Sequence, residues 1–244
     1  MSTLARIIAG SIISLFVTSC NFDINFGPGI SGDGNVVKEK RKIENEFNGI
    51  KVSRGIEVIL YQGRSVSLEV EADENLQDVI TTEFDDDNNL LRITSNENIK
   101  SAASKKVHLS VTDLSRIITT SGSYVYSETS FDLDKLHIES TSGSRVNLDL
   151  DTEVLKVSST SGAGIKLEGS TNELTVSSTS GSYVSANNLR ALTTNVSASS
   201  GANITVNTQK ALTASASSGG NITYSGNPKE VEKNNAVSRR ISAQ

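Results

Sequence analysis

The sequence predicts an all-β fold, a parallel β-helix-like solenoid whose coils are about 20 residues long. Composition is the first observation: the 244 residues include no tryptophan and two prolines, while serine, threonine, asparagine and glycine are abundant. Such a mixture is typical of short strands joined by many turns. A Ser-Gly pair also recurs six times at nearly constant spacing, and apolar and polar residues alternate on both sides of it. Together these observations indicate strands that stack coil upon coil.

Six glycines define the repeat, and they follow one another at intervals of 21, 19, 19, 20 and 18 residues. They are Gly122, Gly143, Gly162, Gly181, Gly201 and Gly219. The third residue after each glycine is aliphatic and β-branched in every copy: Val125, Val146, Ile165, Val184, Ile204 and Ile222. The fifth residue before each glycine is also apolar: Ile117, Ile138, Val157, Val176, Val196 and Ala214. Each coil is therefore expected to contribute two short strands, each with one buried face.

The length of the repeat decides between architectures. A strand-helix-strand unit needs roughly 30 residues and a propeller blade roughly 40, so this coil fits neither. Parallel stacking at about 4.8 Å remains, and it places like residues over like. The serine before each glycine is expected to bond the turn backbone or the next coil, and the glycine to supply a positive φ. Serines acting as nucleophiles or as an ice-binding array are the alternative, which we disfavour because a turn needs small polar residues anyway.

Residues 1–19 are predicted to be a lipoprotein signal peptide. Arg6 precedes an apolar run, residues 7–17, that is too short for a transmembrane helix, which needs roughly 20 residues. The next residues, Val17-Thr18-Ser19-Cys20, resemble the lipobox of bacterial lipoproteins, in which cleavage makes the cysteine the new N-terminus and a lipid is attached to it. We expect lipid on Cys20 to hold the protein at a membrane of the cell envelope, periplasmic or surface-facing. An ordinary secreted protein and a retained transmembrane helix are the alternatives.

Two polar segments are expected to flank the solenoid. Residues 20–42 are predicted to form a flexible tether, because glycine, asparagine and charged residues dominate there. Residues 229–244 are predicted to supply one terminal cap strand, at residues 237–241, and a loose polar tail. The domain between them, residues 43–228, is expected to be one stack from end to end.

The first part of that domain, residues 43–114, is less regular than the repeat. Residues 56–60, 66–70 and 107–111 alternate cleanly between apolar and polar, and residues 84–90 are typical of a hairpin turn. We expect these strands to continue the same stack.

Several short motifs together resemble one known family. Phe47-Asn48-Gly49-Ile50-Lys51-Val52, the Thr-Ser-Gly-Ser corners and Tyr224-Ser225-Gly226-Asn227-Pro228 are similar to the GIN domain, the head domain of auto-transporter adhesins. The resemblance implies a right-handed parallel β-helix-like fold in envelope lipoproteins and implies no catalytic residues. Residues 237–241 depart from the pattern because they lack a glycine corner.

Candidate catalytic residues are few. His108 and His137 are the only histidines, and alternation is expected to send both outward. Without a histidine partner the serines lack the base that nucleophilic catalysis normally requires. A single cysteine excludes an internal disulfide and a cysteine-based metal cluster. We therefore predict a protein that is not an enzyme and that has no metal and no cofactor.

A polysaccharide-active β-helix enzyme is an alternative prediction, because the sequence contains clustered acidic residues. The clusters are Asp149, Asp151 and Glu153, and Glu83, Asp85, Asp86 and Asp87. Acids close in sequence on a turn are usually only solvated. Asp85, Asp87 and Asn89 match the opening of a calcium loop, but Leu90 stands where that loop needs glycine, which disfavours calcium.

Three tyrosines are the candidate surface contacts: Tyr124, Tyr126 and Tyr183, which stand beside the corners. Aromatic rings on a solenoid face can stack on sugars or on a partner; isolated exposed rings are the simpler interpretation.

The formal charge of -5 is spread along the chain, so nucleic acid is not expected as a partner. The prediction is a non-catalytic, lipid-anchored, adhesin-like or structural module with a protein or glycan ligand. A polysaccharide-active enzyme and an envelope-stress or signalling component are the alternatives.

Overall fold

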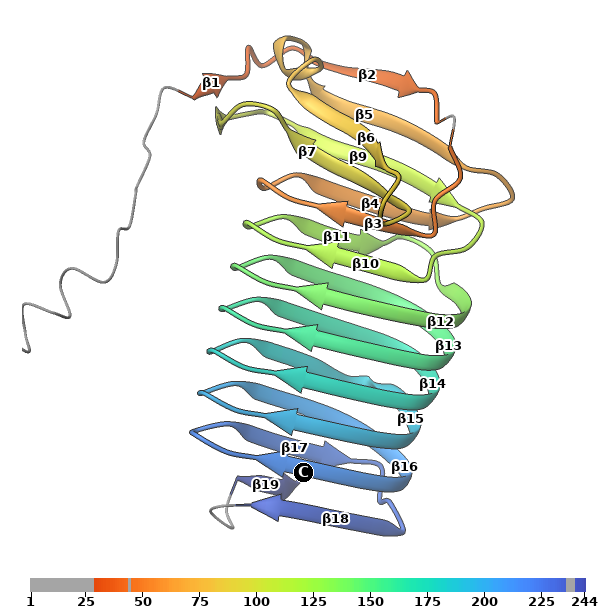
Figure 1. Ribbon diagram of the computed structural model, residues 1–244, viewed down its shortest axis with the longest axis vertical. Helices are drawn as coiled ribbons and strands as arrows, with labels where there is room; N and C mark the ends of the chain where they lie inside the picture. Colours follow the sequence, from red (N-terminus) through yellow and green to blue (C-terminus); the bar gives the residue numbers. More distant parts are fainter. Residues whose placement is uncertain (1–28, 44, 236–239) are drawn as a thin grey trace, which may run out of the picture.

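The protein is a solenoid of stacked β coils, as predicted (Figure 1). The computed structural model describes residues 29–43, 45–235 and 240–244. Over these residues it contains nineteen strands and a single short 3-10 helix, η1 (Glu74–Leu76). The predicted signal peptide and Cys20 lie outside the described residues.

The regular part of the stack is built from parallel strands that pair only with the coils before and after them. Its strands are β10 (Arg116–Thr119), β11 (Tyr124–Ser127), β12 (Phe131–Ser140), β13 (Arg145–Ser159), β14 (Gly164–Ser178), β15 (Tyr183–Ala198), β16 (Asn203–Ala216) and β17 (Asn221–Ser225). The long strands bend midway, so that each supplies the second arm of one coil and the first arm of the next (Figure 1). Parallel pairing in register follows from the repeat, because equal coils bring equivalent backbone groups to equal heights.

The two apolar columns predicted from the repeat are confirmed. Val146, Ile165, Val184 and Ile204 lie opposite one another in adjacent strands, and none is more than 2% exposed. The second column, represented by Val157 and its register partners, is buried in the same way. β-branched side chains suit such a column because they pack well on a pleated surface.

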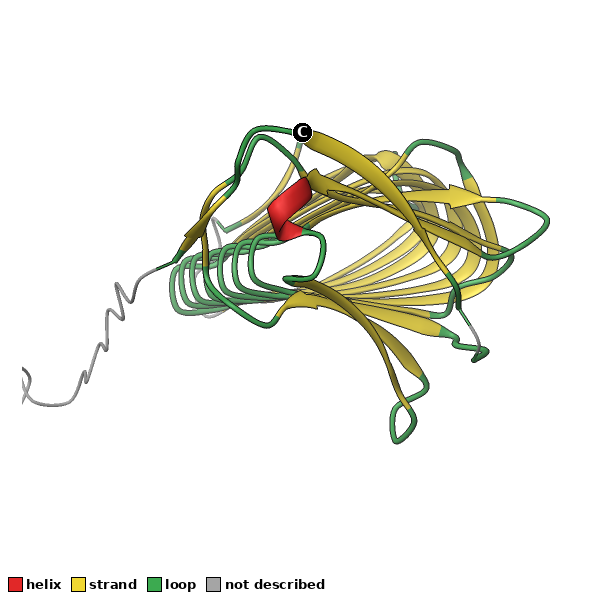
Figure 2. Ribbon diagram, turned by 90° about the horizontal axis from the view of Figure 1, so that it is seen from above, coloured by secondary structure: helices red, strands yellow, loops and turns green. Residues whose placement is uncertain are grey.

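The corners differ in one respect from expectation, since both residues of each Ser-Gly pair have a positive φ. Ser142 has φ 54° and Gly143 has φ 69°. The turn closes through Ser144, whose backbone N–H donates to the carbonyl of Thr141 at 3.2 Å. Between coils the bond runs through the backbone: the N–H of Gly143 donates to the carbonyl of Ser161 at 3.1 Å. Figure 2 shows these corners lying one over another along one side of the stack.

In the described residues, the hydroxyls of the corner serines do not form the predicted hydrogen bonds to the next coil. The Ser142 hydroxyl lies 3.4 Å from that of its neighbour Thr141 and is exposed. The buried hydroxyl is instead that of Ser144, which donates to the Thr141 carbonyl at 2.7 Å. The serine whose hydroxyl makes the buried contact is therefore two residues later than the one predicted.

The first part of the domain continues the parallel stack in four of its seven strands. β3 (Gly49–Val52) and β4 (Glu57–Gln62) pair in parallel with β10 and β11, and β7 (Leu90–Ser95) and β9 (Lys105–Val111) extend them in parallel. β5 (Ser67–Asp73) instead lies antiparallel to β9. β6 (Ile80–Asp85) lies antiparallel to β7, which confirms the hairpin turn at residues 84–90. These strands therefore belong to the same stack, as predicted, but not all of them are parallel.

The predicted flexible tether is also corrected, because part of it is strand. β2 (Val36–Arg41) pairs antiparallel with β5, and β1 (Ile30–Ser31) pairs with β8 (Ile99–Ser101). The charged residues that suggested a tether hold β2 in place. Lys38 forms ion pairs with Glu69 and Glu71, at 3.7 and 3.1 Å.

The C-terminal end forms more structure than the predicted cap strand and tail. β18 (Glu230–Asn235) pairs with β16, and β19 (Ile241–Ala243) pairs with β17, so these strands add a further coil. The expected strand at residues 237–241 falls largely outside the described residues, which end at residue 235 and resume at 240.

Candidate functional site

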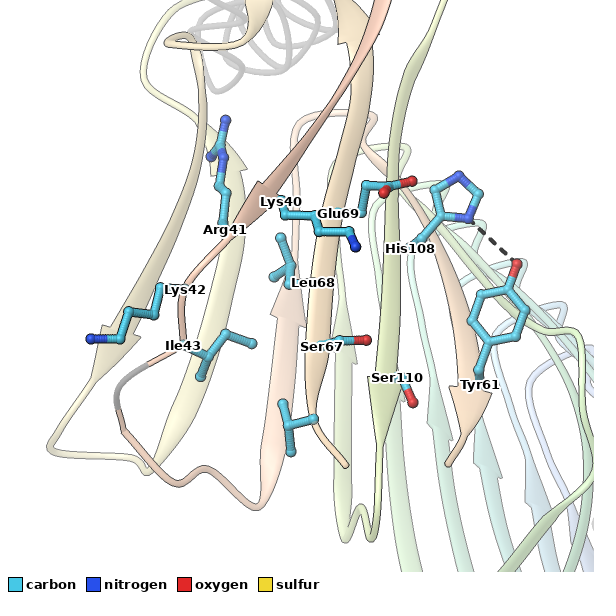
Figure 3. Close-up of a pocket in the computed structure, with 11 residues that line it drawn as sticks. Lys40, Arg41, Lys42, Ile43, Tyr61, Ser67, Leu68, Glu69, His108 and Ser110 are labelled. Atoms are coloured by element: carbon cyan, nitrogen blue, oxygen red, sulfur yellow. Dashed lines mark hydrogen bonds between the residues drawn. The ribbon is translucent and has the colours of Figure 1, made fainter. Parts of the chain in front are cut away.

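An open groove lies at the N-terminal end of the stack, where the chain leaves β2 (Figure 3). Its volume is about 620 Å³, within the range of small-molecule sites. The lining comes from the end of β2, from β4 and β5 and from β9: Lys40, Arg41, Lys42, Ile43, Tyr61, Val66, Ser67, Leu68, Glu69, His108 and Ser110.

Strand alternation sets which side chains face the groove. In β5, Ser67 and Glu69 point outward while Leu68 is buried, and they lie opposite Ser110 and His108 of β9. Lys40 lies opposite Glu69 in the β2–β5 ladder. Figure 3 shows Lys40 directed toward Glu69 and His108.

Arg41 has a structural role at the other side of β2. Its guanidinium donates to the backbone carbonyls of Gln77 and Ile80, and burial lowers the pKa of Arg41. Carbonyl acceptors on a neighbouring segment fix β2 as one wall of the groove. Lys40, on the opposite side of β2 from Arg41, lies across from Glu69 in the ladder.

A chain of hydrogen bonds orients His108. The Tyr61 hydroxyl lies 3.4 Å from His108 Nδ1, and His108 Nε2 lies 3.2 Å from a carboxylate oxygen of Glu71. Glu71 also accepts from Ser104 and pairs with Lys38. Desolvation raises the pKa of Glu71, but the hydrogen bonds from Lys38, His108 and Ser104 outweigh it, so the pKa lies below its ordinary value. Desolvation and the charge of Glu128 raise the pKa of Tyr61.

Tyr124 and Tyr126 extend this surface onto the next coil. Their ring centroids are 5.1 Å apart with an interplanar angle of 29°, so they are neighbours and not the isolated rings of the simpler interpretation. In the register of the sheet, Tyr126 lies beside Ile59 of β4, and Ile59 beside His108. Desolvation, with the charges of Glu57 and Glu128, raises the pKa of Tyr126 to about 12. We call Tyr61, His108, Tyr124 and Tyr126 the tyrosine face.

Tyr183, the third predicted contact, lies apart from the tyrosine face. It shares a column with Tyr124, but Arg145 and Gly164 stand between them. Its ring lies over Gly164, since a Cβ at that glycine would overlap the ring. Tyr183 is 47% exposed.

The acidic clusters do not converge on the groove. Asp149 accepts from Ser130 and Asp151 from Ser170, both on exposed positions of the coils. Asp85 and Asn88 bond each other in the β6–β7 turn. Within the described parts of the chain, no group of three or more His, Cys, Asp or Glu residues is placed to hold a metal ion.

Sequence reasoning missed Tyr61, Lys40 and Glu69, and it treated His108 only as a surface residue. Alternation in residues 56–60 already predicts that Tyr61 points outward. Its approach to His108 depends on the register between β4 and β9, which are 47 residues apart at this pair and which no local pattern fixes. His137 points outward as expected, between the buried Leu136 and Ile138, and is half-buried, with Nδ1 3.6 Å from Glu139. Among the described residues, no helix is long and apolar enough to cross a membrane.

Comparison with known proteins identifies the family. Residues 46–228 match the family described as "Putative auto-transporter adhesin, head GIN domain". Two "putative adhesin" crystal structures share the fold: one from Bacteroides fragilis NCTC 9343 (22% identity, TM-score 0.79, 88% of this chain and 100% of that one) and one from Parabacteroides distasonis ATCC 8503 (18%, 0.71, 88% and 99%). A "putative lipid binding protein" from the latter organism is similar too (18%, 0.65, 88% and 99%). No curated protein matches the chain. Because the family match covers most of the sequence, the chain belongs to this head GIN domain family.

Proposed function

We propose that this protein is a lipid-anchored binding module of the bacterial cell envelope, which holds its ligand on the tyrosine face and in the adjoining groove. The observation that carries the proposal is the placement of four ring side chains and an open groove on one continuous sheet surface. Rings mounted on paired strands are held in place, which favours binding because little freedom is lost. Membership in an adhesin family supports an envelope role.

The charges at the groove favour binding over catalysis. Glu69 is the only acid among the lining residues, whereas glycoside hydrolysis normally uses a pair of carboxylates. A general acid also needs a raised pKa, yet Glu71, the carboxylate bonded to His108, has a lowered pKa. These features support a non-catalytic protein over the polysaccharide-active alternative.

The interior of the coils does not offer a lipid site of the kind that the name of one similar structure suggests. The gap bounded by Leu60, Leu114 and Phe131, among others, has no room for a water molecule. A packed apolar core of this kind leaves the outer surface as the place for a ligand.

The anchor is tested by metabolic labelling with a fatty-acid analogue in cells that express the full chain or Cys20→Ala. We expect label on the full chain only, and its recovery in the membrane fraction. Equal labelling of the two proteins would refute the lipid anchor. Protease treatment of intact cells then reports whether the domain is surface-exposed, and Tyr183→Ala serves as an expression control.

A further inference from the structure

The groove and the tyrosine face share features that point to one class of ligand. We propose that they bind a short stretch of glycan, with sugar rings lying on the tyrosine face and sugar hydroxyls bonded in the groove. This inference rests on the proposed function, because it names the ligand of the same surface.

The ring geometry supports sugar stacking. The C–H face of a pyranose is apolar and packs on aromatic rings, while the hydroxyls around its rim need polar partners. The Tyr61 and His108 rings are 6.3 Å apart and inclined by 18°, and the Tyr124 and Tyr126 rings are 5.1 Å apart. The two pairs lie on adjacent strands, since β4 pairs with both β9 and β11. Successive sugars can therefore use successive strands.

The polar groups of the groove match the hydroxyls of a sugar. Lys40 supplies a donor, Glu69 an acceptor and Ser67 a hydroxyl that does both. The Ser110 hydroxyl donates to the Ser65 carbonyl and can still accept. Glu69 pairs with Lys38 at 3.7 Å, a long contact, so the carboxylate keeps acceptor capacity for a ligand. Lys40 and Glu69 lie opposite each other across the β2–β5 ladder, and the guanidinium of Arg41 is bonded to backbone carbonyls, so the lining has more cations (Lys40, Arg41 and Lys42) than acids. Neutral sugars with neighbouring hydroxyls fit such paired donors and acceptors.

A protein ligand is less well matched. Protein interfaces concentrate their energy in buried apolar and aromatic anchors that form one patch. The exposed large apolar side chains of the described residues are dispersed over different elements: Val36, Val66, Tyr183, Leu192 and Val231. Of these, only Val66 lines the groove. The surface therefore has rings surrounded by polar groups, and it lacks a contiguous apolar patch.

The test uses the full-length protein in detergent and isothermal titration with four trisaccharides: cellotriose, mannotriose, tri-N-acetylchitotriose and trigalacturonate. We expect at least one neutral trisaccharide to bind, and Tyr61→Ala and Tyr126→Ala each to weaken it about tenfold. Glu69→Gln, which keeps the shape of the side chain, is expected to weaken it as well. Circular dichroism melting curves show that each variant is folded.

Tyr183→Ala is the matched control, since it removes an exposed ring four coil steps, or about 19 Å, from β4 on the same face. A trisaccharide seated at Tyr61 is expected to be affected about twofold or less by this change. The inference is overturned if none of the four sugars binds, if trigalacturonate alone binds, or if Tyr183→Ala weakens binding as much as Tyr61→Ala. Each of these results leaves the labelling of Cys20 and envelope attachment unaffected, so failure of the glycan inference is distinguishable from failure of the proposed function.

Discussion

At the scale of single residues, the corner serines are the least expected feature. A turn in which both central residues have a positive φ is the type I′ pattern, which suits a two-residue corner and favours Asn-Gly over Ser-Gly. Serine adopts this conformation at a cost, whereas asparagine tolerates it better. The polar composition predicts a turn at each corner, but the sign of the serine φ follows from how the two arms meet and is not visible in the sequence.

A substitution at one corner tests this account. Ser161→Asn is expected to raise the free energy of unfolding by about 0.5 kcal/mol, and Gly162→Ala to lower it by about 1 kcal/mol or more. A Cβ at Gly162 would meet no other atom within 4 Å, so any loss comes from the backbone conformation. Urea denaturation measures both changes. A neutral Gly162→Ala would contradict the backbone explanation.

The internal column allows a sharper test at a neighbouring pair of residues. Ile165→Ala is expected to lower the free energy of unfolding by about 3 kcal/mol, because Ile165 is fully buried and its removal leaves a cavity. Lys166→Ala, one residue later and directed to solvent, is expected to change it by less than about 0.5 kcal/mol. Similar losses for the two variants in guanidinium denaturation would show that the column is not the core.

At the scale of elements, the sequence predicts strands better than it predicts their direction. Alternation identifies β4, β5 and β9, and the repeat fixes the parallel register from β10 onward. The antiparallel placement of β2 and β5 depends on contacts between segments about 30 residues apart. The charges of Lys38 and Arg41 fit a solvated tether, but they fit an edge strand equally well, since charged side chains are common there. Composition therefore does not distinguish the two. The groove could not be predicted for the same reason: β2 forms one of its walls.

Asp73 holds this N-terminal part together. The buried carboxylate accepts backbone N–H groups from Gly34, Ala103 and Ser104, each at 2.9 Å, and so joins the β1–β2 connection to the segment before β9. The hydrogen bond from Ser104 is the largest of the contributions that lower the pKa of Asp73. The ionised carboxylate of Asp73 therefore stabilises the fold fully above the unfolded pKa of about 3.9, and this stabilisation is lost as the pH falls through the lower folded pKa.

We expect Asp73→Asn to lower the melting temperature by several degrees at neutral pH, because asparagine cannot accept all these bonds with a charge. The difference from the unmodified protein should shrink as the pH is lowered toward the folded pKa. Asp132→Asn, on an exposed position of β12, is the control and should have little effect. A difference that stays constant down to acidic pH in calorimetric scans would argue against an ionised Asp73.

At the scale of the whole molecule, the stack has an end that must be closed. β18 and β19 cover the lower edges of β16 and β17, and the exposed side chains of β18 include Glu230, Glu232 and Lys233. Charged side chains on a terminal strand discourage pairing with another molecule. The sequence predicted one cap strand because no glycine corner marks this coil.

Deletion of residues 229–244 is expected to uncover the edges of β16 and β17 and to cause self-association. Size-exclusion chromatography with light scattering would show the deleted form eluting as oligomers while the full chain at the same concentration does not. A monomeric deletion variant of unchanged stability would mean that the coil ending at β17 closes the stack by itself.

The position of β2 has a mechanical consequence. Load applied to the chain before Ile30 reaches the short β1–β8 pairing first and the β2–β5 ladder next, ahead of every coil of the regular stack. Lys40 stands on β2, so peeling that strand away dismantles one side of the groove while the rings of β4 and β11 stay in place. A force applied from the N-terminal side is therefore coupled to ligand binding, because it would open the groove before it unfolded the coils of the regular stack.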